Sequence, residues 1–120
     1  MKKKTLVLGA SEKTDRYSNM AVRLLVAHQH PVVAIGNKAG TIQDISISTE
    51  MQPLNDVHTV TLYLNPTNQQ PYYDYILSLH PKRIIFNPGT ENETLKALAA
   101  ENGIATQEAC TLVLLNTAQY

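Results

Sequence analysis

The segment "VLGASEKTDRYSN", residues 7–19, joins an apolar strand to the start of a helix through a loop that begins with glycine. Residues 5–10, "TLVLGA", form a short apolar run, which is typical of a strand buried on both faces. Residues 18–30 place apolar side chains at helical spacing, with Ser18 or Asn19 as a suitable N-cap. A strand, a glycine turn and a helix start are the usual parts of a phosphate-binding corner. This stretch therefore predicts a βα unit whose turn is able to receive a phosphate.

The remainder of the chain alternates between apolar strands and amphipathic helices. Further strands are expected at residues 31–36, 58–64, 82–86 and 104–107. Within the less regular residues 41–57, "DISIS" alternates apolar and polar side chains, so we expect a single short exposed strand there. Residues 37–40 and 87–89 contain Gly, Pro and Asn, and they are expected to form turns.

Two helices are expected between the later strands. Residues 65–79 begin with Asn-Pro, a good cap and first helical residue, but Pro71 follows within the same segment. A proline deep inside a helix costs about 3 kcal/mol, so we expect this helix to begin only at Gln69 or Gln70.

Residues 90–103 show the clearest helical pattern in the chain. Thr90 and Glu93 have the spacing of a capping box, and Gly103 stands where a C′ glycine is expected. Residues 109–115, "ACTLVLL", are compatible with either a helical turn or a strand.

Strands that alternate with helices indicate a parallel sheet with right-handed crossovers and helices on both faces. The predicted fold class is therefore α/β, a doubly wound parallel sheet that is Rossmann-like and three-layered (αβα), with residues 1–120 as a single domain. In such sheets ligands bind beyond the carboxyl ends of the strands, where the strand order reverses. The loops that meet this edge are residues 9–18, 36–40, 65–66 and 87–90.

Composition excludes several classes of function. Ten Lys and Arg residues balance ten Asp and Glu residues, which argues against binding nucleic acid through broad phosphate neutralisation. No apolar run approaches the roughly 20 residues that span a bilayer, and none resembles a signal peptide. The only cysteine, Cys110, excludes an internal disulfide. We expect a soluble cytoplasmic protein without nucleic-acid or membrane partners.

The choice of nucleotide depends on the ends of the first two strands. The dinucleotide fingerprint G-x-G-x-x-G is absent, because only its first glycine, Gly9, is present. NAD sites place an acid after the second strand to bind the ribose hydroxyl, but this chain has Asn37 and Lys38 there. A lysine in this position attracts a phosphate on the ribose. The residues therefore favour NADP or coenzyme A (CoA) over NAD.

The sequence resembles the family of small stand-alone CoA-binding domains, Rossmann-type domains similar to the nucleotide-binding part of the succinyl-CoA synthetase α subunit. The matching pieces span nearly the whole chain in order: "VLGAS" at 7–11, "RYSNMAVRLL" at 16–25, "PVVAIGNK" at 31–38, "LNP" at 64–66, "IIFNPGTENE" at 84–93, "AAENGI" at 99–104 and "EAC" at 108–110. The chain departs from the family pattern at Lys38, where the family usually has proline, and at Ala109, where it often has arginine.

This resemblance implies a CoA site. Gly9, Ala10 and Ser11 would line the pyrophosphate, and Arg16 and Ser18 would add a charge-assisted contact and a hydroxyl. The remaining residues that the resemblance implies face the adenosine (Asn37, Lys38), border the adenine or pantetheine (Asn65, Pro66) and close the far side (Asn87, Pro88, Gly89). The implied ligand is CoA or an acyl-CoA. Ligase activity is not implied, because the histidine that carries the phosphoryl group in the synthetase belongs to a separate domain.

No set of residues in the sequence predicts catalysis or a metal site. We therefore expect a binding function in preference to an enzymatic one. The alternatives are an NADP-dependent oxidoreductase and a regulatory or structural domain that has lost its ligand. Cys110 is expected to be a buried structural residue, with a mixed disulfide to the CoA thiol as the alternative. Among the four histidines only the pair His28 and His30 has a spacing found in metal sites, and we expect these two to face the carbonyls at the end of a helix. Tyr72, Tyr73 and Tyr75 are expected to pack a helix face against the core, with stacking on a base as the alternative.

Overall fold

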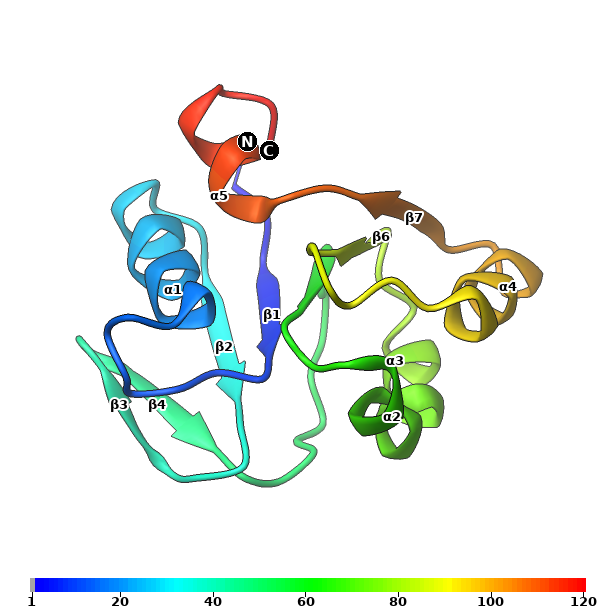
Figure 1. The fold of residues 1–120 in the computed structure, drawn as a ribbon, viewed down its shortest axis with the longest axis horizontal. Coiled ribbons are helices and arrows are strands. Elements are labelled where there is room, and N and C mark those ends of the chain that lie inside the picture. The colour runs from blue at the N-terminus through cyan, green and yellow to red at the C-terminus, as the bar shows by residue number, and fades with distance from the viewer. Residues whose placement is uncertain (1) are drawn as a thin grey trace.

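The computed structural model describes residues 2–120, which form one seven-stranded sheet with helices on both faces (Figure 1). The strands are β1 (Thr5–Leu8), β2 (Val32–Ile35), β3 (Gly40–Ile42), β4 (Ile45–Ser48), β5 (Thr59–Leu62), β6 (Arg83–Phe86) and β7 (Ala105–Glu108). They are ordered β3-β4-β2-β1-β5-β6-β7, and all neighbours are parallel except β3 and β4. The predicted class, a doubly wound Rossmann-like α/β fold, is confirmed.

The strand order reverses at β1, which lies between β2 and β5. From β1 the chain passes through α1 (Tyr17–Ala27) to β2 and on to the β3–β4 hairpin at one edge. It then returns to the other side of β1 as β5 and continues outward to β6 and β7. Leu8 at the end of β1 is in register with Ile35 of β2 and Leu62 of β5. The three strands therefore end at one level, and the loops that follow them meet at the switch point.

The sheet separates two apolar layers, because successive side chains of each strand point to opposite faces. On one face Val7 packs with Val22 and Leu25 of α1 and with Leu115 of α5 (Thr111–Asn116). On the other face the helical elements are α2 (Pro66–Gln69), the 3₁₀ turn η1 (Gln70–Tyr72), α3 (Tyr73–Leu79) and α4 (Glu93–Glu101). Both layers are fully desolvated at the centre, which fixes the strands beneath the switch point.

Two predictions at the amino-terminal half are corrected. Residues 40–48 form a hairpin of two strands, where only one short exposed strand was expected. Helix α1 begins at Tyr17, and Arg16 is its N-cap residue, so the prediction of Ser18 or Asn19 as the cap was wrong. Those two residues lie in the first turn and are buried, with 4% and 2% of their surface exposed.

The segment around Pro71 is also corrected. Asn65 caps α2, which begins at Pro66 and not at Gln69 or Gln70. The chain accommodates Pro71 by switching to a 3₁₀ turn between α2 and α3, so no long helix has to lose a hydrogen bond. The open choice for residues 109–115 is resolved as a helix, α5.

The N-cap of α4 is Asn92, and the predicted capping box of Thr90 and Glu93 was wrong. The Asn92 side chain accepts a hydrogen bond from the backbone N–H of Leu95 at 3.1 Å, while the Thr90 hydroxyl donates to the backbone oxygen of Asn87. Gly103 follows the helix with φ of +71°, as a C′ glycine should. Among residues 2–120 there is no helix with the length and apolar character needed to cross a bilayer.

The cap of α4 provides a test of the fold. Asn92→Ala removes the helix cap and the donor for two partners of the Asn92 amide, the buried Gln69 Oε1 and the partly buried Tyr73 hydroxyl. We expect the free energy of unfolding to fall by about 2–4 kcal/mol, measured by urea denaturation. The matched variant Glu93→Ala should cost under about 1 kcal/mol, since Glu93 contributes only a dipole interaction. Equal losses of unfolding free energy in the two variants would indicate that Thr90 and Glu93 do form a capping box.

Candidate functional site

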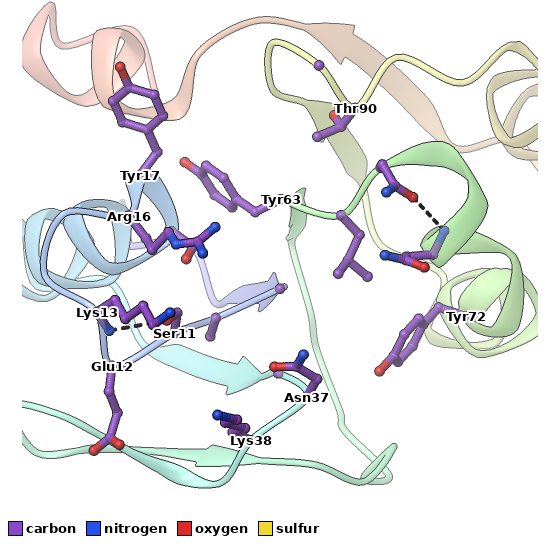
Figure 2. Close-up of a pocket in the computed structure, with 18 of the residues that line it drawn as sticks. Ser11, Glu12, Lys13, Arg16, Tyr17, Asn37, Lys38, Tyr63, Tyr72 and Thr90 are labelled. Atoms are coloured by element: carbon purple, nitrogen blue, oxygen red, sulfur yellow. Dashed lines mark hydrogen bonds between the residues drawn. The ribbon is translucent and has the colours of Figure 1, made fainter.

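A cavity of about 940 Å³ lies beyond the carboxyl ends of β1, β2 and β5 (Figure 2). This volume is at the upper end of the range of about 300–1,000 Å³ found for small-molecule sites. Ten of the twelve residues predicted for the CoA site line it: Gly9, Ala10, Ser11, Arg16, Ser18, Asn37, Lys38, Asn65, Pro88 and Gly89. The structure therefore brings together four loops that are far apart in the sequence.

Two glycines allow the backbones of these loops to converge. Gly9 has φ of +94°, and a Cβ at this position would lie 3.0 Å from the backbone carbonyl of Tyr63. A Cβ at Gly36 would overlap the backbone oxygen of Ala10. Since no side chain separates the loops at either point, the main chain itself forms the floor of the cavity. A ligand can consequently approach the main chain after β1 closely, where the N–H groups of Gly9 and Ala10 already donate to the backbone oxygen of Ile35.

The loop after β1 is held in place by polar contacts with α1. The Asn19 side chain donates to the backbone oxygen of Ser11 at 2.9 Å, and its own oxygen accepts from Arg23 Nε at 2.7 Å. Arg23 in turn donates to the backbone oxygen of Thr14 at 3.2 Å. The Ser11 hydroxyl accepts from the N–H of Lys13, as Figure 2 shows. The loop is therefore shaped before any ligand binds.

The opposite wall is held by a buried amide network. Gln69 is fully buried, and its Nε2 donates to the backbone oxygens of Leu64 and Thr90, both at 2.8 Å. The Gln69 Oε1 accepts from Asn92, the cap of α4, at 2.9 Å. This network joins the loop after β5 to the loop after β6. It fixes the two cavity-lining residues Leu64 and Thr90 relative to each other.

The charge of the lining is mostly positive. Lys13 and Arg16 lie on the loop after β1, Lys38 lies after β2, and Glu12 is the only acid in the wall. Across residues 2–120 the only ion pair within 4 Å is Lys96–Glu108 at 4.0 Å, outside the cavity. The three cations therefore have no carboxylate partner. An exposed surface of this kind favours an anionic ligand.

Two predicted residues do not line the cavity. Pro66 is exposed at the first position of α2, where it starts the helix behind Asn65. Asn87 is 2% exposed and lies beneath the site: its side chain donates to Thr61 Oγ1 at 2.7 Å and accepts from the N–H of Thr111 at 2.9 Å. Asn87 thus ties β5, β6 and the start of α5 together, and it supports Pro88 and Gly89 from below.

Sequence reasoning missed nine lining residues, which are Glu12, Lys13, Tyr17, Gly36, Tyr63, Leu64, Asn68, Tyr72 and Thr90. Glu12, Lys13 and Tyr17 lie within the loop that the sequence had already singled out. Tyr72 was expected to pack against the core, with stacking on a base as the alternative; it packs against the core and also lines the cavity (Figure 2). Tyr73 and Tyr75 pack against the core as predicted.

The Tyr63 phenol and the Cys110 thiol are two further reactive groups in this part of the fold. Burial raises the pKa of the Tyr63 phenol above its ordinary value of 10.0, so it remains protonated at neutral pH. Cys110 is only half-buried at the N-cap of α5, which corrects the expectation of a buried thiol. The described chain, residues 2–120, holds no cluster of three His, Cys, Asp or Glu side chains suited to a metal ion.

The convergence of loops at Gly36 is open to test. Gly36→Ala should lower the free energy of unfolding by about 2 kcal/mol or more, because the added methyl overlaps a backbone oxygen that cannot move alone. Gly40→Ala is the matched control. There the methyl meets only the flexible end of the Glu12 side chain, so the loss should stay under about 1 kcal/mol. A Gly36→Ala variant as stable as the parent in urea would show that the loops do not touch.

Comparison with known proteins gives a consistent result. A crystal structure of an uncharacterized protein is 48% identical, with a TM-score of 0.97 over 100% of this chain and 99% of its own. A hypothetical protein from Pyrococcus horikoshii OT3 is 19% identical, with a TM-score of 0.83 over 96% of this chain and 83% of its own. The dinucleotide-forming acetyl-coenzyme A synthetase 1 of Ca. Korarchaeum cryptofilum, in complex with phosphate and ADP, is 15% identical, with a TM-score of 0.71 over 89% of this chain and 25% of its own.

The Pyrococcus horikoshii protein and the synthetase show a similarity of fold alone, because their sequence identities are only 19% and 15%. No curated protein matches the chain at a significant level. The sequence model described as CoA binding domain matches residues 3–116, which is nearly the full length. Together with the shared fold, this confirms the resemblance read from the sequence: the chain belongs to the family of CoA-binding domains.

Proposed function

We propose that this domain binds CoA or an acyl-CoA in the cavity at the switch point and has no catalytic activity of its own. The observation that carries the proposal is the set of three unpaired cations, Lys13, Arg16 and Lys38, around a floor made of main chain. Membership of the CoA-binding domain family supports the same ligand.

The diphosphate is assigned to the corner between β1 and α1. Gly9, Ala10 and Ser11 have no large side chain, so phosphate oxygens can approach their main chain closely. Because the N–H groups of Gly9 and Ala10 already donate to the backbone oxygen of Ile35, the amide donors assigned to the phosphate are those of Ser11 and of the first turn of α1. The cap residue of α1, Arg16, makes no side-chain hydrogen bond to the helix, so the first-turn amides of α1 keep their donors free. The positive end of the helix dipole and the Arg16 guanidinium then act on the same anion. The Ser18 hydroxyl adds a neutral contact.

The adenosine end is assigned to the segment after β2. Asn37 and Lys38 stand where an NAD site has an acid, and an acid would repel a phosphorylated ribose. The Lys38 ammonium is instead suited to the ribose phosphate that distinguishes CoA from dephospho-CoA. The same argument admits the phosphorylated ribose of NADP, so NADP is the second candidate.

The pantetheine arm is assigned to the wall formed by the loops after β5 and β6. Asn65, with Pro66 behind it, borders the cavity on one side, and Pro88 and Gly89, supported by Asn87, close the other. The Asn65 side-chain oxygen is engaged in capping α2, where it accepts a hydrogen bond from the backbone N–H of Asn68 at 2.8 Å. The Asn65 amide nitrogen therefore remains as the donor for a ligand carbonyl.

Thermal unfolding with CoA and with NADP tests the proposal. At about 100 times its Kd, a bound ligand stabilises the folded state by about 2.7 kcal/mol, which raises the Tm measurably. We expect this rise with CoA and not with NADP. A rise with NADP alone would favour an NADP-dependent oxidoreductase. No rise with either ligand would favour a regulatory or structural domain without ligand binding.

Titration calorimetry on Arg16→Ala is the control for the position of the ligand. Loss of a charge-assisted contact should weaken CoA binding by about 10-fold or more without changing the Tm of the free protein. The matched variant is Lys82→Ala, which removes an exposed cation before the amino end of β6, at the opposite edge of the sheet. Equal affinity in Arg16→Ala and the parent would remove Arg16 from the site.

A further inference from the structure

Glu12 connects the two segments that carry the cations of the cavity. Its Oε2 accepts a hydrogen bond from the backbone N–H of Thr41 in β3 at 2.9 Å. The side chain lies flat against Gly40, where a Cβ would overlap its carboxyl end. Figure 2 shows Glu12 extending from the loop after β1 toward the hairpin, on the same side as Lys38. Because Gly40 has no side chain, Glu12 can reach Thr41 and connect the loop after β1 to the β3–β4 hairpin.

The Glu12–Thr41 hydrogen bond is the outer of two connections between the loop after β1 and the segment after β2. At the base, the backbone N–H groups of Gly9 and Ala10 both donate to the backbone oxygen of Ile35, at 2.9 and 3.0 Å. Beyond the base the two chains diverge around the cavity. Glu12 rejoins them at Thr41, three residues after Lys38, and so limits how far Lys38 can move from the loop that carries Lys13 and Arg16.

The charge of Glu12 does not account for its position. Among residues 2–120 no cation lies within 4 Å of the Glu12 carboxylate, although three line the same cavity. A carboxylate beside a phosphate site weakens anion binding through Coulomb repulsion, and this repulsion is largest for the ligand with the most phosphates. Its compensating contribution is therefore geometric: it holds the Lys38 segment at a set distance from the diphosphate corner.

We infer that Glu12 is a positioning residue that makes the site selective for a ligand with two separated phosphate groups, a diphosphate and a ribose phosphate. This inference rests on the proposed CoA site and adds a specificity determinant to it. CoA and dephospho-CoA differ only by the ribose phosphate. The ratio of their dissociation constants therefore reports how well Lys38 is placed, independently of all other contacts.

Titration calorimetry with both ligands tests the inference. Glu12→Ala should lower the preference for CoA over dephospho-CoA by about threefold or more, as expected for loss of one ordering hydrogen bond. Glu12→Gln keeps an acceptor oxygen for the Thr41 N–H and removes the charge, so the preference should be retained or increased. Gly40→Ala displaces the side chain of Glu12 and should reproduce the effect of Glu12→Ala.

Asp15→Ala provides the charge control, because it removes an exposed acid from the same loop that does not line the cavity. If Glu12 acted through charge, Glu12→Ala would raise the preference for CoA, as Asp15→Ala should to a small degree. An unchanged or raised preference in Glu12→Ala, with CoA bound normally by the parent, overturns this inference alone. Failure of the parent protein to bind either ligand overturns the proposed CoA site and this inference together.

Discussion

The close approach of backbones at the switch point is the constraint on which the rest of the site depends. β1, β2 and β5 end in register, and the loops that follow them touch through main chain at Gly9 and Gly36. A Cβ at Gly9 would press on the backbone of Tyr63, and a Cβ at Gly36 would overlap the backbone oxygen of Ala10. The close approach of the loops around the cavity therefore requires that these two residues lack a Cβ.

Buried amides and exposed cations have separate roles around this corner. Asn19, Gln69, Asn87 and Asn92 are at most 8% exposed, and their hydrogen bonds hold the loops to α1, α2, α4 and α5. Lys13, Arg16 and Lys38 are exposed and have no ion-pair partner in the part of the chain that the structure describes. Buried amides thus hold the loops together, while the exposed cations are available to bind the charge of a ligand. This division is suited to a polyanionic ligand such as CoA.

The sequence predicted six of the seven strands, the fold class and the edge at which the loops meet, because apolar runs and helical spacing record burial directly. The resemblance to the CoA-binding domain family named ten of the residues that line the cavity. Helix starts were less predictable. Asn92, and not Thr90, is the cap of α4, and its side chain also donates hydrogen bonds to Gln69 and Tyr73, which are distant in the sequence. The position of Tyr72 at the cavity and the Glu12–Thr41 contact depend on how separate segments meet, and no local pattern indicates them. Pro66 and Asn87 were predicted as site residues, but only their neighbours in the sequence, Asn65 and Pro88, line the cavity.

The most direct test of the account is the response of individual backbone amides to CoA, followed by ¹⁵N NMR during a titration. If the diphosphate binds the corner after β1, the amide signals of Ser11 and of the first turn of α1 should show the largest shifts, because the N–H groups of Gly9 and Ala10 already donate to Ile35. Shifts centred on the shallow groove between α1 and α5, near Met20 and Leu112, would contradict this account. So would saturable CoA binding that leaves the amides of Ser11 and of the first turn of α1 unchanged.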